Sequence, residues 1–158
     1  MNMQISIKQA LRISEIEAVR QLLTDYGNSR DWDSALGDYD TELAKLPYRY
    51  AAPDGRLFLA FYDDQVAGCV AFQKLSEDIC EMKRLYVDPD FRGKKVGSAL
   101  IDAICKSATE AGYQFMRLDT FASFTAAIEA YKKVGFYEIP PYQKYGMEGI
   151  LFFEKKLQ

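Results

Sequence analysis

The chain has 158 residues, 49% of them hydrophobic and 27% charged, and a formal net charge of −3. This length predicts a single domain over residues 1–158, with the composition of an ordinary globular protein. The slightly negative charge argues against nucleic acid as a partner, because nucleic-acid-binding domains usually carry a basic surface. No run of 18 apolar residues occurs, so we predict no membrane-spanning helix and no membrane partner.

The chain has no histidine and three cysteines. Histidine is the commonest general base and metal ligand, so its absence predicts no metal site and a catalytic set drawn from carboxylates, Tyr, Lys, Ser or Cys. Cys69, Cys80 and Cys105 all lie in apolar runs, which favours small buried thiols in a reducing cytoplasm. The first residues, MNMQISIKQ, lack the basic and apolar pattern of a signal peptide, which also favours a cytoplasmic location.

The first part of the chain predicts a strand at residues 4–10 and a helix that Ser14 opens, with Glu17 completing a capping box. Residues 24–47 predict a loop followed by one short helix, which Pro47 ends. Two strands are predicted at residues 56–63 and 65–75, and a tight turn at Asp63–Asp64 joins them. Residues 80–87 form a third strand, which completes an antiparallel meander.

The second half predicts a strand–helix–strand unit from residues 80–87, 97–111 and 115–120, with the two strands parallel. A helix at 124–134, which Gly135 ends, and two closing strands complete the pattern. The prediction is therefore a mixed α+β fold with about four helices around a mostly antiparallel sheet of six or seven strands.

The segment FRGKKVGSALI follows Val87, at the C-terminal end of a parallel strand, where open sheets bind ligands. Its glycines relax the backbone, and the helix that follows presents unpaired N–H groups with positive charge at the rim. These features suit a phosphate group, although a solvated connection is the alternative interpretation. The segment has neither the nucleotide-hydrolase P-loop pattern nor the dinucleotide fingerprint.

Two motifs resemble the GCN5-related N-acetyltransferase (GNAT) superfamily. YVDPDFRGKKVGSALI resembles its acetyl-CoA loop, Arg/Gln-x-x-Gly-x-Gly/Ala: Arg92 and Gly97 match the first and last positions, and Lys95 replaces the middle glycine. AAIEAYKKVGF resembles the downstream Ala-Ile-x-x-Tyr-x-x-x-Gly-Phe element, with Tyr131 at its centre. The Asn often found seven residues before that tyrosine is Phe124 here.

The resemblance implies a three-layer α/β/α GNAT fold with acetyl-CoA as cofactor and an amine as acceptor substrate. The loop would bind the cofactor's pyrophosphate through backbone N–H groups, and the strand edge would bind its pantetheine arm as an added strand does. Thr120, at the end of the second parallel strand, is expected at the same site. The expected cofactor-binding residues are therefore Thr120 together with Leu85, Tyr86, Val87, Arg92, Gly93, Lys94, Lys95, Val96, Gly97 and Ser98.

Two side chains are candidates for acid–base catalysis. Periodicity alone makes Tyr131 a core aromatic residue, whereas the resemblance makes it the acid that protonates the departing thiolate. Glu81 matches the catalytic Glu of histone-type members, and strand alternation predicts that it shares a face with Leu85 and Val87. The alternatives are a Glu paired with a neighbouring cation on a solvated face, or a water chain as base. A backbone N–H near Leu85 is the expected oxyanion donor.

The acceptor is less constrained by the sequence. An acidic segment either steers a cationic amine or is a solvated loop; its residues are Asp25, Asp31, Asp33, Asp38, Asp40 and Glu42. Trp32 and Tyr142 are the candidate pocket residues. The leading prediction is direct transfer of an acetyl group to the primary amine of a small molecule in a ternary complex. A protein or peptide acetyltransferase and a non-catalytic acyl-CoA sensor are the alternatives, and a homodimer is left open.

Overall fold

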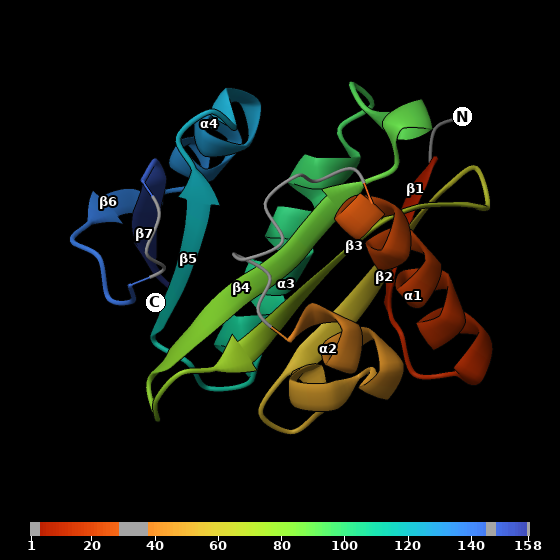
Figure 1. The fold of residues 1–158 in the computed structure, drawn as a ribbon, viewed down its shortest axis with the longest axis horizontal. Coiled ribbons are helices and arrows are strands. Elements are labelled where there is room, and N and C mark those ends of the chain that lie inside the picture. The colour runs from red at the N-terminus through yellow and green to blue at the C-terminus, as the bar shows by residue number, and fades with distance from the viewer. Residues whose placement is uncertain (1–3, 29–37, 145–147, 158) are drawn as a thin grey trace.

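The computed structural model describes residues 4–28, 38–144 and 148–157. In this part of the chain, seven strands form one sheet in the order β1-β2-β3-β4-β5-β7-β6 (Figure 1). The strands are β1 Ile5–Gln9, β2 Arg56–Tyr62, β3 Gln65–Lys74, β4 Ile79–Val87, β5 Phe115–Phe121, β6 Tyr137–Ile139 and β7 Ile150–Lys156. The pairing is antiparallel throughout except between β4 and β5, as predicted.

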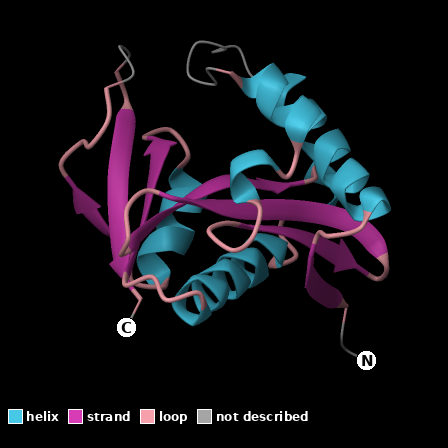
Figure 2. Cartoon of the chain, turned by 90° about the horizontal axis from the view of Figure 1, so that it is seen from below, coloured by secondary structure: helices cyan, strands magenta, loops and turns pink. Residues whose placement is uncertain are grey.

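Four α-helices in the described residues cover the two faces of this sheet. They are α1 Ile13–Asn28, α2 Tyr39–Lys45, α3 Val96–Glu110 and α4 Thr125–Lys133; the 3-10 turns η2 Tyr48–Tyr50 and η3 Pro89–Phe91 complete the elements. Helices α1 and α2 pack on one face, and α3 and α4 on the other (Figures 1 and 2). The predicted three-layer α/β/α architecture is thus confirmed. No helix in the described ranges is long and apolar enough to cross a membrane.

Local sequence explains most of these elements. Helix α3 buries its whole apolar stripe, which consists of Val96, Leu100, Ile101, Ile104, Cys105 and Ala108. The turn between β2 and β3 places Asp63 at φ 49° and Asp64 at φ 68°, the two consecutive left-handed residues of a two-residue hairpin. The predicted tight turn and meander are therefore confirmed.

The predicted capping box of Ser14 and Glu17 is wrong, because other residues cap the first helix. Helix α1 begins at Ile13, and Glu15 rather than Glu17 returns to its start. The Glu15 carboxylate accepts hydrogen bonds from the backbone N–H groups of Arg12 at 2.9 Å and Leu11 at 3.1 Å. These two bonds lower the pKa of the Glu15 carboxyl. The helix therefore starts two residues earlier than a Ser14 cap would require.

Strand β4 is paired to its two neighbours over different lengths. It follows β3 from Cys80 to Val87, but it pairs with β5 only over Ile79–Glu81. Beyond Glu81 the two parallel strands separate, as Figure 1 shows. The edge of β4 that follows is not taken up by a neighbouring strand, so a cleft opens at this point of the sheet.

Candidate functional site: a cleft between the parallel strands

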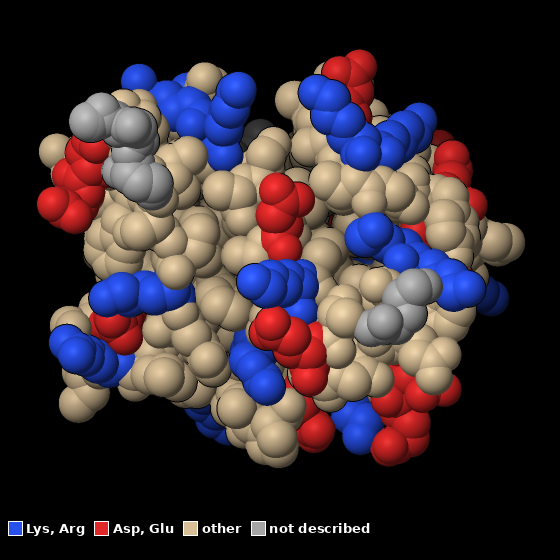
Figure 3. All heavy atoms as spheres, turned by 180° about the vertical axis from the view of Figure 1, so that it is seen from behind, with Lys and Arg blue, Asp and Glu red and all other residues tan. Residues whose placement is uncertain are grey.

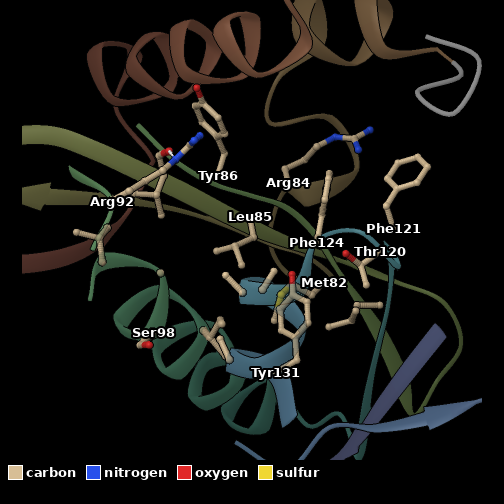
Figure 4. A pocket seen from close by; sticks show the side chains of 18 of the residues that line it. Met82, Arg84, Leu85, Tyr86, Arg92, Ser98, Thr120, Phe121, Phe124 and Tyr131 are labelled. Carbon is tan, nitrogen blue, oxygen red and sulfur yellow. Dashed lines mark hydrogen bonds between the residues drawn. The ribbon is translucent and has the colours of Figure 1, made fainter. Parts of the chain in front are cut away.

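A cleft of about 910 Å³ occupies this opening. Its walls are the second half of β4, the η3–α3 connection, β5 beyond Leu118, and helix α4 (Figure 4). Figure 3 shows Lys and Arg side chains at the top edge of the face that carries α3 and α4, on either side of a hollow. The cleft thus combines an uncovered strand edge, a helix start and a basic rim.

The α3 end of the cleft is built from backbone. No side chain caps the start of α3, and the first N–H groups of a helix have no acceptor within the helix. Gly93 lies at φ +80°, and a Cβ added there would meet nothing within 4 Å. The helix dipole and these N–H groups together make a site for an anion such as a phosphate.

Lys95 adopts the conformation that glycine usually supplies. It precedes α3 with φ 69° and ψ 16°, in the left-handed region. The loop therefore keeps its turn despite the substitution in the motif, and the cost of this conformation is about 1–2 kcal/mol for a residue with a Cβ.

Arg92 and Lys94 both lie against aromatic rings. The Arg92 Nε donates to the carbonyl oxygen of Val87 at 3.0 Å, and its guanidinium lies 5.7 Å from the Tyr86 ring, which places it at the cleft edge (Figure 4). The Lys94 ammonium lies 5.4 Å from the Tyr62 ring. Arg92 lines the cleft and Lys94 does not.

Tyr131 projects from α4 into the middle of the cleft, below Leu85 and Met82 (Figure 4). It is 6% exposed, and its ring packs edge-on against Phe136. Burial raises the pKa of Tyr131, and the neighbouring Tyr26 and Asp119 raise it further. The hydroxyl therefore keeps its proton at neutral pH and is suited to donate it.

Glu81 lies outside the residues that line the cleft. It is fully buried, and both carboxylate oxygens accept hydrogen bonds, from Gln73 Nε2 at 2.8 Å and from the Tyr142 hydroxyl at 2.7 Å. The Lys83 ammonium is 3.9 Å away. Glu81 is thus hydrogen-bonded to the other predicted residue Tyr142, while the predicted pocket residue Trp32 falls outside the described residues.

The predicted alternation along β4 is wrong because a bulge interrupts the strand. Arg84 and Leu85 together face one residue of β3, Val70, and the backbone at Arg84 has φ 62°. Before the bulge Met82 faces the α3 core, and after it Leu85 does so. Glu81 therefore does not share a face with Leu85.

Most of the residues expected at the cofactor line this one cleft. Those lining it are Leu85, Tyr86, Val87, Arg92, Gly93, Lys95, Val96, Gly97, Ser98 and Thr120. Sequence reasoning missed Tyr26 on α1, Asp119 and Phe121 on β5, and Arg84 on β4, which also line it. Phe124 lines it too, 5.5 Å from the Phe121 ring. The family motif marks position 124, but no pattern in the sequence marks the others.

Comparison with known proteins identifies the class. The model of the acetyltransferase (GNAT) family matches residues 16–136. An N-acetyltransferase of Schizosaccharomyces pombe, not itself characterised, is 30% identical, with 97% of this chain and 95% of the relative covered. The IAA acetyltransferase of Azospirillum brasilense is 35% identical, with 89% and 92% covered. The solved structure of yncA, an acetyltransferase of Salmonella typhimurium with acetyl-CoA, superimposes with a TM-score of 0.79 at 17% identity, covering 99% and 95% of the two chains.

The chain therefore belongs to the GNAT acetyltransferase family. It is an acyl-CoA-dependent N-acetyltransferase, and acetyl-CoA is its cofactor. The cleft fits this cofactor on its own features: the α3 end offers uncapped N–H groups to a pyrophosphate, and the adjoining edge of β4 offers backbone groups to an extended amide chain.

Proposed function

We propose that the protein transfers the acetyl group of acetyl-CoA directly to the primary amine of a small molecule in a ternary complex. The observation that carries this proposal is the shared cleft. The pyrophosphate-type site at the start of α3, the edge of β4 and the Tyr131 side chain all line it. The expected donor site and the expected acid are therefore part of one connected space.

Acetyl-CoA, when bound, supplies a thioester whose carbonyl an amine can attack. Val96, Gly97 and Ser98 would hold the pyrophosphate through their N–H groups, and the edge of β4 would hold the pantetheine arm. A backbone N–H near Leu85 would stabilise the carbonyl oxygen as it gains charge. Tyr131 would donate its proton to the leaving sulfur; burial raises its pKa, so the hydroxyl carries that proton at neutral pH.

Direct transfer is favoured over an acyl-cysteine intermediate by the state of the three thiols. Cys69, Cys80 and Cys105 are buried, and none lines the cleft. Burial raises the pKa of Cys69 and Cys80 to about 12 and that of Cys105 to about 11. A thiol that keeps its proton is a poor nucleophile. Buried thiols of this kind are also compatible with the cytoplasmic location that we propose.

Two carboxylates compete for the role of base. Glu81 is the base that the family resemblance predicts. Its carboxylate accepts hydrogen bonds from Tyr142 and Gln73 and lies outside the cleft wall. Asp119 is the one carboxylate among the described residues that line the cleft. It lies on β5 two residues beyond Arg117, the last β5 residue paired with β4. We retain Glu81 as the motif-based prediction and set Asp119 beside it as the candidate that the cleft favours.

A small-molecule acceptor is supported by the relatives whose names state a substrate. These include the IAA acetyltransferase and the N-acetylaspartate synthetase of Danio rerio, which is 32% identical over 70% of this chain. Both names refer to small molecules. A ribosomal-protein-S18-alanine N-acetyltransferase of Escherichia coli shares the fold at 20% identity and a TM-score of 0.69.

The test is a thiol-release assay with acetyl-CoA and a panel of amines, run beside the Tyr131→Phe variant. The panel contains amino acids, aryl- and alkylamines, polyamines, and peptides with a free N-terminus or lysine. Turnover with a small amine and none with the peptides supports the proposal. Turnover confined to peptides contradicts it in favour of a protein acetyltransferase. Acetyl-CoA binding without turnover of any amine favours a non-catalytic sensor.

A further inference from the structure

A buried ion pair joins helix α2 to strand β4 beside the cleft. Arg84 donates from Nε to one Glu42 oxygen at 2.7 Å and from its terminal nitrogen to the other at 2.8 Å. Glu42 is 1% exposed, and the Arg84 side chain is 12% exposed. The sequence placed Glu42 in a solvated or substrate-steering acidic segment, so its burial against Arg84 is a correction.

Neighbouring aromatic groups fix both partners of this pair. The Tyr50 hydroxyl donates to Glu42 Oε2 at 2.9 Å. The Arg84 guanidinium lies 5.0 Å from the Tyr39 ring, and the Tyr39 hydroxyl donates to the carbonyl oxygen of Leu23 on α1. Two groups of α2 therefore contact the Arg84 side chain, and these groups are held in turn by Tyr50 of η2 and by the Leu23 carbonyl of α1.

That side chain belongs to the bulge residue. Arg84 is one of the few residues other than glycine with a positive φ, 62°, in the described chain. The left-handed conformation is unfavourable for a residue with a Cβ and persists where the surroundings enforce it. Bulges next to active sites re-aim side chains and strand edges. Here the bulge turns Leu85 toward the α3 side and Tyr86 toward α1.

We propose that Glu42 is a positioning residue: its fork of hydrogen bonds to Arg84 holds the left-handed backbone of the bulge and thereby sets the edge of β4 at Leu85–Val87 for the thioester. This inference rests on the proposed function, because it assigns a purpose to the strand edge in that reaction. Glu42 acts through Arg84 and touches neither substrate nor cofactor.

The test compares two double variants that both remove the buried charges. Glu42→Met with Arg84→Met leaves a residue with a Cβ at the bulge, whereas Glu42→Met with Arg84→Gly leaves a glycine, which tolerates φ 62° without a partner. Both avoid an unpaired buried charge, and both remove the acceptor of the Tyr50 hydroxyl, so this loss of stability is equal in the two and their difference reports the bulge residue. Thermal unfolding, acetyl-CoA affinity and kcat are measured for each. Glu77→Gln, which removes the charge of the surface Lys74–Glu77 pair away from the cleft, is the control.

We expect kcat of the Met/Met variant to fall about 10- to 100-fold, because small misplacements of reacting groups have effects of this size. The Met/Gly variant should keep about tenfold more activity than the Met/Met variant, and the control should stay within about threefold of the original chain. Acetyl-CoA affinity of the Met/Met variant should fall less than its kcat, because the start of α3 is untouched and only the strand edge is displaced. Equal loss in both double variants would overturn the inference, because Arg84 would then act directly. Full activity in both would also overturn it.

Failure of the proposed function itself gives a different result. If that proposal is wrong, the unaltered protein transfers no acetyl group to any small amine, and peptide transfer or binding alone is seen. The comparison of the two double variants can then be made on peptide turnover, where the same rank order supports the positioning role and an equal effect contradicts it.

Discussion

The two ends of the cleft are built by different means. The α3 end uses backbone from a continuous segment, residues 85–98, and its anion site depends on a helix start and two left-handed residues. The opposite end uses side chains from β4, β5 and α4, and the Glu42–Arg84 and Glu81–Tyr142 contacts lie behind these elements. The first kind of site recurs wherever a short motif recurs, whereas the second can differ between relatives with the same fold.

This comparison predicts a large loss of catalysis where the two ends meet, at Tyr131. Tyr131→Phe should lower kcat by about 10- to 1,000-fold while acetyl-CoA affinity stays unchanged, because a general acid is lost but no cofactor contact at α3. Burial raises the pKa of Tyr131, so the hydroxyl stays protonated and the loss should be constant from about pH 6 to pH 9. Unchanged kcat, or a loss confined to alkaline pH, would remove Tyr131 as the acid.

A negative charge at the start of α3 should weaken cofactor binding and leave the fold intact. Ser98→Glu places a carboxylate in the first turn, where it favours the helix dipole but repels a pyrophosphate. We expect acetyl-CoA affinity to fall about 10- to 100-fold, or about 1.4–2.8 kcal/mol. Thermal stability without ligand should be equal or higher.

Isothermal titration measures this change, and Ser98→Gln is the matched neutral control. Equal affinity of the Glu and Gln variants would mean that the pyrophosphate does not bind at this helix start.

The base is tested by pH–rate profiles of three variants. A base must be ionised to work, so activity rises with pH along its acidic limb. Glu81→Gln or Asp119→Asn should flatten that limb, whichever carboxylate is the base, and lower the rate by about 10²- to 10⁴-fold. Tyr142→Phe removes the hydrogen bond to Glu81 but keeps the carboxylate.

A flattened limb in Glu81→Gln together with an unaltered limb in Tyr142→Phe would assign the base to Glu81. A normal acidic limb in Glu81→Gln would dismiss it, and a normal limb in both carboxylate variants would favour a water chain.

The smallest effect is expected at Lys95, which stands where the family motif has glycine. Lys95→Gly relieves a left-handed strain of about 1–2 kcal/mol and adds about 0.5–1 kcal/mol of unfolded-state entropy, so stability should rise by about 0–1.5 kcal/mol. Acetyl-CoA affinity should stay within about threefold, measured by titration. A large loss of affinity would show that the Lys95 side chain itself binds the cofactor.

Sequence reasoning predicted the architecture and the α3 end because both depend on local patterns. The apolar stripe of α3, the Asp63–Asp64 turn and the strand–helix–strand unit are each visible in a short window. The bulge at Arg84 is not, because the partner of its side chain, Glu42, is 42 positions away in the chain. A single inserted residue reverses strand alternation, which is why Glu81 was assigned to the wrong face.

The residues that sequence reasoning missed at the end of the cleft opposite α3 also depend on distant parts of the chain. Asp119 and Phe121 occupy ordinary strand positions, and only the separation of β4 from β5 gives them a cleft to line. That separation is a property of the whole sheet.

The most direct test of the account is the thermal stability of the purified protein with and without acetyl-CoA. At 100 times its Kd, the ligand should add about 2.7 kcal/mol to the free energy of unfolding. The stabilisation should shrink in Ser98→Glu and persist in Tyr131→Phe. An identical unfolding transition with and without saturating acetyl-CoA would contradict the assignment of this cleft as the cofactor site.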